Sequence, residues 1–177
     1  MRWRNGGVLP DMPDFGDFTV RSFDGSDSDI EKWLDTVQYG LTEKREDADF
    51  FASCMLSHRN IEYDKIFIAE KDGDAAATLT VICDYINKEG YIHMVACKPQ
   101  YRGRGLGNAL CVLSVRTLML AGMETAYLTT DDFRIPAIKS YLRAGFFPDL
   151  STEDFKSRWK KIFSNDKNFL NCAKNIK

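Results

Sequence analysis

Patterns for metal binding and for disulfide bonding are almost absent from this sequence. Its 177 residues include two histidines and five cysteines, and no two cysteines form a Cys-x-x-Cys pair. His58 and His93 have no acidic or cysteine partner at the spacing of metal ligands, so we predict no metal site. The number of cysteines is odd and three of them lie inside apolar segments, which is typical of reduced core thiols.

Long hydrophobic runs and an excess of one charge are absent as well. The longest apolar run, residues 109–121, contains Arg116 and is much shorter than the ~20 residues of a membrane-spanning helix. A net charge of −2 argues against general binding to nucleic acid. The basic N-terminal residues are followed by no apolar stretch, so they do not resemble a secretory signal. We therefore expect a cytoplasmic protein that binds neither nucleic acid nor membranes.

The length and composition indicate one globular domain. A chain of 177 residues, of which 44% are hydrophobic and 28% charged, is long enough to bury a single core. Residues 1–16 contain three glycines and two prolines without periodicity, and we expect an irregular N-terminal arm there. Residues 17–177 are then predicted to form the domain.

The spacing of apolar residues predicts strands and helices in a mixed order. A capping sequence at residues 26–29 predicts a helix start, and Asp72-Gly73 is a strong signal for a hairpin turn. Aromatic residues at 155, 159 and 163 predict an amphipathic C-terminal helix within residues 151–177. Further helices are expected over 43–57, 105–121 and 134–143, and strands over 18–23, 66–69, 75–85, 90–97, 125–130 and 146–147. This order indicates a mixed α/β (α+β) fold.

The most informative segment, residues 98–108, lies between an apolar strand and a long apolar helix. Glycines at every second position allow sharp turns and bring backbone N–H groups to a helix N-terminus, where anions bind. Arg102 and Arg104 add positive charge between these glycines. The spacing fits neither the dinucleotide-binding fingerprint nor the P-loop. It therefore predicts a pyrophosphate loop of another kind, with glycines at Gly103, Gly105 and Gly107.

This loop resembles the acetyl-CoA signature of the GCN5-related N-acetyltransferase (GNAT) superfamily, Arg/Gln-x-x-Gly-x-Gly/Ala. Arg102, Gly105 and Gly107 satisfy it. Residues 131–146 are similar to a second motif of that family, Asn-x-x-Ala-x-x-x-Tyr-x-x-x-Gly-Phe, with Arg134 in the place of the usual asparagine. Together the resemblance covers about residues 66–150, whereas the first 60 residues match in pattern only.

The resemblance implies a mostly antiparallel central sheet, flanked by helices, in which the fourth and fifth strands splay apart. It also implies acetyl-CoA as the co-substrate, bound by the glycine loop and by free backbone groups at the end of the preceding strand. Arg134 could reach a phosphate through paired hydrogen bonds. The cofactor-binding residues expected on this basis are Val95, Ala96, Cys97, Arg102, Gly103, Arg104, Gly105, Leu106, Gly107, Asn108 and Arg134.

Three residues are candidates for proton transfer. Tyr141 stands where the family commonly places a tyrosine near the CoA sulfur, although it could instead pack as a core phenol. Glu89 and His93 are candidate bases, and a chain of waters could replace either. On a regular strand, His93 would share one face with Val95 and Cys97.

The resemblance implies an N-acetyltransferase in which a primary amine of a small molecule or a peptide attacks the thioester directly. The alternative is a CoA-binding regulatory or interaction module with little transfer activity. Acidic residues within 43–49 could attract a cationic amine, or they could form a solvated helix face. A homodimer is compatible with the resemblance.

Overall fold

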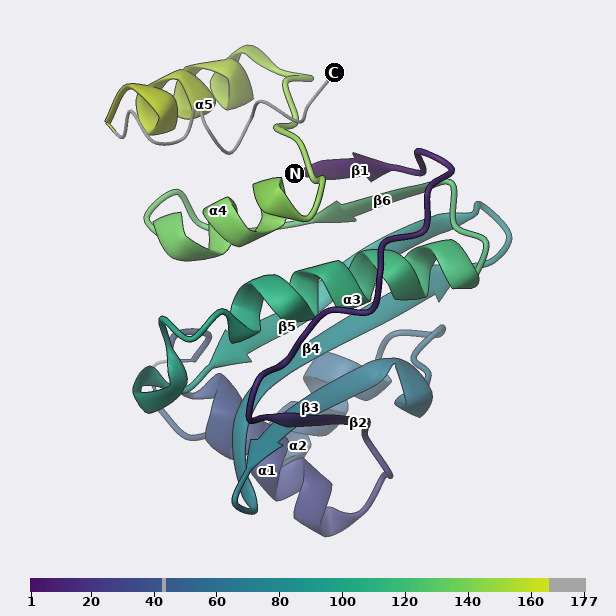
Figure 1. Ribbon diagram of the computed structural model, residues 1–177, viewed down its shortest axis with the longest axis vertical. Helices are drawn as coiled ribbons and strands as arrows, with labels where there is room; N and C mark the ends of the chain where they lie inside the picture. Colours follow the sequence, from purple (N-terminus) through teal and green to yellow (C-terminus); the bar gives the residue numbers. More distant parts are fainter. Residues whose placement is uncertain (43, 166–177) are drawn as a thin grey trace.

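The sheet at the centre of the protein has six strands, and every neighbouring pair but one is antiparallel. The computed structural model describes residues 1–42 and 44–165, and its strand order is β1-β6-β5-β4-β3-β2 (Figure 1). β5 and β6 form the parallel pair. The strands are Arg2–Arg4 (β1), Thr19–Ser22 (β2), Ile66–Lys71 (β3), Asp74–Asp84 (β4), Glu89–Cys97 (β5) and Thr125–Leu128 (β6). The predicted fold class is confirmed.

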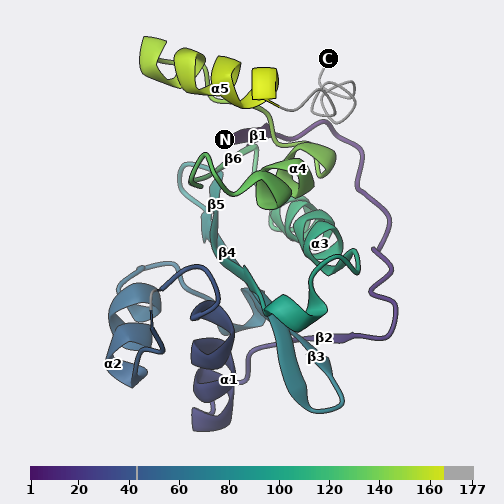
Figure 2. The ribbon, with the colours of Figure 1, turned by 90° about the vertical axis from the view of Figure 1, so that its left-hand side faces the viewer.

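Helices cover both faces of this sheet, as Figure 2 shows. One face carries α3 (Leu106–Leu120) and α4 (Ile135–Arg143), and the other carries α1 (Asp27–Val37), α2 (Ala48–Phe51) and the π-helical turn η1 (Ala52–Leu56). Two 3-10 turns, η2 (Tyr63–Lys65) and η3 (Pro99–Tyr101), precede β3 and α3. Over residues 1–42 and 44–165, no helix is both long and apolar enough to cross a membrane.

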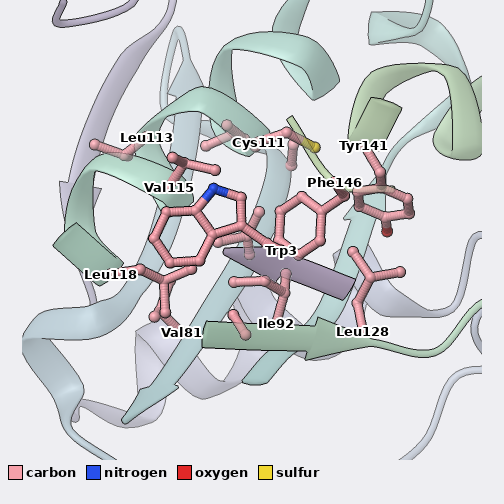
Figure 3. Close-up of a cluster of buried hydrophobic side chains, with 14 of the residues drawn as sticks. Trp3, Val81, Ile92, Cys111, Leu113, Val115, Leu118, Leu128, Tyr141 and Phe146 are labelled. Atoms are coloured by element: carbon pink, nitrogen blue, oxygen red, sulfur yellow. The ribbon is translucent and has the colours of Figure 1, made fainter. Parts of the chain in front are cut away.

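Each face of the sheet has its own hydrophobic cluster. The cluster under α3 includes Leu118 and Phe146 (Figure 3), and the cluster under α1 and α2 is built around Trp33 and Phe51. These side chains are almost fully buried. Burial of each such side chain contributes about 1.5–3 kcal/mol before the loss of conformational entropy is counted. The two clusters therefore fix both helical layers on the sheet.

The start of the chain differs from the predicted irregular arm. Residues 2–4 form β1, which pairs antiparallel with β6, and Trp3 is 4% exposed in the α3-side cluster (Figure 3). Alternation of Arg2, Trp3 and Arg4 suits an edge strand, but three residues are too few to be recognised by period. The following segment crosses α3 (Figure 1), where Arg116 donates a hydrogen bond to the carbonyl of Pro10.

Other predicted elements also need adjustment. The helix expected over 43–57 begins at Ala48, after the cap Asp47, and widens into η1. Phe147 makes only an isolated bridge to Arg2 instead of a strand, because β1 already occupies the edge of β6. The C-terminal helix α5 covers Glu153–Asn165 and packs on α4 through an apolar cluster. Residues 166–177 of that prediction lie outside the described residues.

β5 is paired along its whole length on one side but only in its first half on the other. Its pairing with β6 ends at Ile92, whereas its pairing with β4 continues to Cys97. A register shift and the left-handed conformation of Met94, with φ +49°, mark a β-bulge in between. The second half of β5 thus has one free edge, as the splayed pair of the expected fold requires.

The bulge makes one prediction wrong. Val95 and Cys97 pack against the α3-side cluster, while His93 contacts Cys54 of η1 on the opposite face. An extra residue in one strand inverts the alternation of side chains beyond it. His93 therefore does not share a face with Val95 and Cys97.

Candidate active site

The N-terminus of α3 has no side-chain cap. Ser26 caps α1 and Asp47 caps α2 through side-chain oxygens, but the cap position of α3 is Gly105, with φ +83°. The first intrahelical bond runs from the N–H of Ala109 to the carbonyl of Gly105. The preceding N–H groups of the helix have no intrahelical acceptor, and the helix dipole adds positive potential at that end. This terminus can bind an anion through backbone alone.

The two arginines of the loop are directed to groups of the protein. Arg102 donates from Nε to the carbonyl of Cys97 over 2.9 Å and from Nη2 to the carbonyl of Tyr39 over 2.8 Å. Arg104 donates from Nη2 to both carboxylate oxygens of Asp17, over 2.6 and 2.8 Å, and lies over the ring of Phe18. Arg102 thus joins the glycine loop to the segment after α1, and Arg104 joins it to the segment before β2.

The remaining loop residues differ in their surroundings. A Cβ added at Gly103 or Gly105 would meet no atom within 4 Å, so both backbones are open to approach. Leu106 is buried in the α3-side cluster. The buried Oδ1 of Asn108 receives no hydrogen bond from any described residue. A cavity of about 540 Å³ lies between residues 10–16 and the first turns of α3, and Asn108 is one of its lining residues.

A cavity of about 320 Å³ lies where β5 separates from β6. We call the part lined by Val95, Ala137 and Tyr141 its α4 side, and the part lined by Leu41, Tyr91, His93 and Met94 its α1 side. The α4 side belongs to the cluster under α3, and Leu41 and Met94 to the cluster under α1. The other lining residues are Ile92, Thr129, Thr130, Asp131 and Arg134. The cavity thus connects the two faces of the sheet.

Tyr141 both packs in the core and lines this cavity. It is 5% exposed, lies at the edge of the α3-side cluster beside Phe146 (Figure 3), and lines the α4 side. Among the described residues, no group forms a hydrogen bond with its hydroxyl. Burial raises the pKa of the phenol far above its ordinary value of 10. Tyr141 therefore presents a protonated hydroxyl that a ligand can engage.

His93 lies on the α1 side between two hydrogen-bonding groups. Nε2 is 3.3 Å from the carbonyl oxygen of Cys54, and Nδ1 is 3.1 Å from the hydroxyl of Tyr91. An Nε2–H tautomer donates to the carbonyl and leaves Nδ1 to accept from Tyr91. Burial, together with the nearby ring of His58, lowers the pKa of His93 to about 4. The imidazole is therefore uncharged at neutral pH.

Glu89, the second candidate base, is not brought to the cavity. It lies at the start of β5, where Arg2 donates to its carboxylate over 3.1 Å. The salt bridge to the edge strand explains this placement, which the sequence did not reveal because β1 was not predicted. Arg134 does line the cavity, with Nε 2.9 Å from Asp131 in an ion pair that lacks hydrogen-bond geometry.

The three residues at the end of β5 that were expected to offer backbone contacts to the co-substrate have different surroundings. Val95 lines the cavity, whereas Ala96 packs in the α1-side cluster and Cys97 against the α3-side cluster. Sequence reasoning did not assign Tyr91 or Leu41 to the site. Tyr91 stacks on Tyr127 at 4.7 Å between ring centroids, which resembles ordinary core packing in sequence. Within the described ranges no group of three His, Cys, Asp or Glu side chains could hold a metal ion.

Comparison with known proteins places this arrangement in a family. The model of the acetyltransferase (GNAT) family matches residues 28–146, so the chain belongs to that family. A GCN5-related N-acetyltransferase from Sphaerobacter thermophilus superposes with a TM-score of 0.66 at 21% identity, over 81% of this chain and 47% of that one. The ribosomal-protein-S18-alanine N-acetyltransferase from Escherichia coli gives 0.61 at 22% identity, over 75% and 79% of the two chains.

Curated relatives match over shorter stretches. The mycothiol acetyltransferase of Streptomyces bingchenggensis is 31% identical over 80 residues, which are 45% of this chain and 26% of that protein. The mycothiol acetyltransferase of Arthrobacter sp. (strain FB24) is 37% identical over 57 residues, or 32% and 18% of the two chains. The chain thus spans about a quarter or less of the length of these relatives.

Proposed function

We propose that this protein transfers an acetyl group from acetyl-CoA to a primary amine. The observation that carries the proposal is the cavity at the separation of β5 and β6, which Tyr141 lines, together with the uncapped N-terminus of α3 after the loop that follows β5. Membership of the acetyltransferase (GNAT) family supports it. Named relatives include acetyltransferases for mycothiol and for an alanine of a ribosomal protein, so small-molecule and peptide amines are both candidate acceptors.

The glycine loop fits the pyrophosphate of acetyl-CoA. Backbone N–H groups at residues 106–108 have no intrahelical acceptor, and Gly103 and Gly105 leave the approach to them open. Oxygen atoms of a pyrophosphate would accept from these groups. The open face of the loop is an observation on this chain that agrees with the signature Arg102, Gly105 and Gly107.

The free edge of β5 suits the thioester. Backbone groups after Ile92 have no strand beside them on the β6 side, so an N–H near Val95 can donate to the acetyl carbonyl oxygen as negative charge develops there. The amine nitrogen forms a bond to the carbonyl carbon, and the carbon–sulfur bond then breaks. Tyr141 gives a proton to the departing sulfur, and the proton that the nitrogen loses restores the phenol. The unpaired hydroxyl supports this role, and burial keeps the phenol protonated until the thiolate departs.

Calorimetry of acetyl-CoA binding tests the cradle directly, with NAD and ATP as comparison ligands. We expect micromolar binding that Gly105→Glu abolishes, because a carboxylate then occupies the anion site. Gly122→Glu, at the other end of α3, is the matched control: Gly122 also has a positive φ of 76° and open space around it, so the backbone strain is similar. Equal losses from both variants, or no binding by the folded wild type, would contradict the proposal.

The second candidate is a CoA-binding module with little transfer activity. The weakly basic His93 favours it, and so does the position of Glu89, which pairs with Arg2 and does not line the cavity. Tyr141→Phe separates the two functions by assay of released CoA. An enzyme loses turnover and keeps its affinity for CoA, whereas a binding module has no turnover to lose.

A further inference from the structure

The α1 side of the cavity offers no described carboxylate to a positively charged ligand. Its side chains are Leu41, Tyr91, His93 and Met94. Two of these are apolar and two are uncharged hydrogen-bonding groups. Because a charged amine inside such a pocket would lose water without gaining a counter-ion, its entry is unfavourable.

The groups that surround His93 from neighbouring elements also carry no negative charge. From η1, burial raises the pKa of the Cys54 thiol, which lies 3.6 Å from Nε2. The ring of His58 stands 4.9 Å away. On the sheet, burial raises the pKa of Tyr127, against which Tyr91 stacks. No described neighbour on these elements supplies a negative charge to the α1 side.

Asp131, which lines the cavity, and Glu89, at the start of β5, are each paired with an arginine. Asp131, on the rim of the cavity, lies 2.9 Å from the guanidinium of Arg134. Glu89 pairs with Arg2 outside it. The paired Asp131 and Arg134 therefore give the described rim no net charge.

The proton balance of the reaction leads to the same constraint. The nitrogen of an uncharged primary amine carries two protons. When it forms the carbon–nitrogen bond and the carbon–sulfur bond breaks, one of these protons is transferred overall from nitrogen to sulfur. An ammonium must release an additional proton before its lone pair can attack. His93 holds a proton poorly because its environment is buried and lacks a carboxylate.

We propose that the amine binds at the α1 side of the cavity, and that this acceptor site selects primary amines that are substantially uncharged near neutral pH. The α-amino group of a peptide or amino-acid derivative is such an amine, whereas strongly basic alkylamines such as the lysine side chain are rejected. This inference rests on the proposed acetyltransferase function and specifies the acceptor class of the same site. At about pH 7.4, roughly 30% of an α-amino group but only about 0.1% of a lysine amine is uncharged, a difference of roughly 300-fold.

A matched series of amines tests the selection. Ethylamine, 2-fluoroethylamine and 2,2,2-trifluoroethylamine have similar sizes, but each fluorine lowers basicity. We expect kcat/KM at neutral pH to be higher for 2-fluoroethylamine than for ethylamine, and kcat/KM for ethylamine to rise tenfold per pH unit until the amine itself loses its charge. A preference for ethylamine, or a plateau set by an enzyme group near neutral pH, would overturn the inference while leaving the acetyltransferase function intact.

Calorimetry gives a readout that does not depend on turnover. Binding of 2-fluoroethylamine to the protein with CoA is measured in two buffers of different ionisation enthalpy, at a pH where the free amine is mostly protonated. We expect about one proton to be released for each amine bound. Release of no proton would show that the site takes the ammonium and would refute the proposal.

Two variants change the charge of the site deliberately. Leu41→Glu places a carboxylate at the α1 side and is expected to shift preference toward ethylamine by about tenfold, whereas the matched Leu41→Gln leaves the order unchanged. Glu43 lies outside the described residues, so Glu43→Gln tests whether its carboxylate contributes to the amine preference. A preference that is the same in wild type and variant supports the proposal. A wild-type preference for ethylamine that the variant abolishes contradicts it. Failure of every amine together with loss of acetyl-CoA binding would instead reject the acetyltransferase function.

Discussion

The two sides of the cavity use different parts of the chain. The groups we assign to acetyl-CoA, on the α4 side and in the glycine loop that follows β5, are mostly backbone: N–H groups of the loop and of the free edge of β5, with Tyr141 as the main side chain. On the α1 side, the lining consists of side chains from β5 and from the loop after α1. Recognition by backbone constrains the sequence to glycines at particular spacings, while recognition by side chains leaves no fixed spacing.

The difference extends to charge. The N-terminal end of α3 is electropositive through its dipole and uncapped N–H groups, whereas the described groups around the α1 side supply no negative charge and His93 is held neutral. One side is therefore suited to an anionic co-substrate and the other to an uncharged nucleophile. Variants that alter one side should leave binding at the other largely unchanged.

The largest expected effect is on the α4 side. Tyr141→Phe removes the hydroxyl proposed to protonate sulfur, and general acid catalysis of this kind contributes about 10²–10⁴-fold to the rate. We expect kcat to fall within that range while the Kd for CoA changes less than threefold. Tyr127→Phe is the control, since Tyr127 does not line the cavity. An equal fall in kcat for both variants would indicate general disruption of packing instead.

The next prediction concerns the neutrality of the α1 side. The pKa of His93 is about 4 in the folded protein, below its ordinary 6.5, so the unfolded chain binds more protons between these values. Stability is then complete above about pH 6.5 and falls by roughly 3 kcal/mol as the pH drops to about 4. Denaturant unfolding at several pH values should show this loss in the wild type, reduced in His93→Gln.

Carboxylates also titrate in part of that range, so the difference between wild type and variant is the quantity to compare. His58→Gln should narrow the pH range over which stability falls, because the ring of His58 contributes to the lowered pKa of His93. An NMR titration that places the His93 transition near 6.5 would refute an uncharged, buried imidazole.

Several parts of this structure could be predicted from local sequence. The hairpin at Asp72-Gly73 forms because both residues have positive φ, which aspartate tolerates and glycine favours. The helix after Ser26 starts where the serine accepts a hydrogen bond from the N–H of Asp29. The position of α3 after the glycine loop follows in the same way. In each case a few neighbouring residues determine the conformation.

Other parts depend on contacts between distant residues. The bulge at Met94 has no compositional signal, because methionine rarely adopts positive φ, and it moved His93 away from the face of Val95. β1 depends on pairing with β6 across more than 120 residues. The partners of Arg102 and Arg104, at Tyr39 and Asp17, could not be identified from the loop alone. Such non-local contacts decide which candidate residues reach the cavity.

Removal of Arg102, which joins the glycine loop to the segment after α1, is expected to have an intermediate effect. Arg102→Ala removes the hydrogen bonds that hold the carbonyls of Tyr39 and Cys97, and loosens the segment that carries Leu41. We expect KM for the acceptor amine to rise about tenfold, which corresponds to about 1.4 kcal/mol, with a smaller change in acetyl-CoA affinity. Hydrogen exchange at residues 38–42 should increase in parallel.

Arg104→Ala is the matched control on the same loop. Arg104 pairs with an exposed carboxylate of Asp17, and exposed ion pairs contribute about 0–1 kcal/mol. We expect little change in either KM. If Arg104→Ala instead weakens acetyl-CoA binding more than Arg102→Ala, the loop arginines contact the pyrophosphate directly and the backbone is not the main anion-binding element.

The smallest effect should come from Asp47, whose side chain caps the N-terminus of α2, whereas the N-terminus of α3 has no side-chain cap. Asp47 accepts a hydrogen bond from the N–H of Phe50 over 3.1 Å at the start of α2. Asp47→Ala should lower the free energy of unfolding by about 1 kcal/mol, measured as a lower denaturant midpoint at constant m-value, while acetyl-CoA affinity stays the same. Asp47→Asn should restore most of the stability, because an amide oxygen also caps. If acetyl-CoA affinity falls in Asp47→Ala, α2 contributes to the co-substrate site, and the two sides of the cavity are not independent.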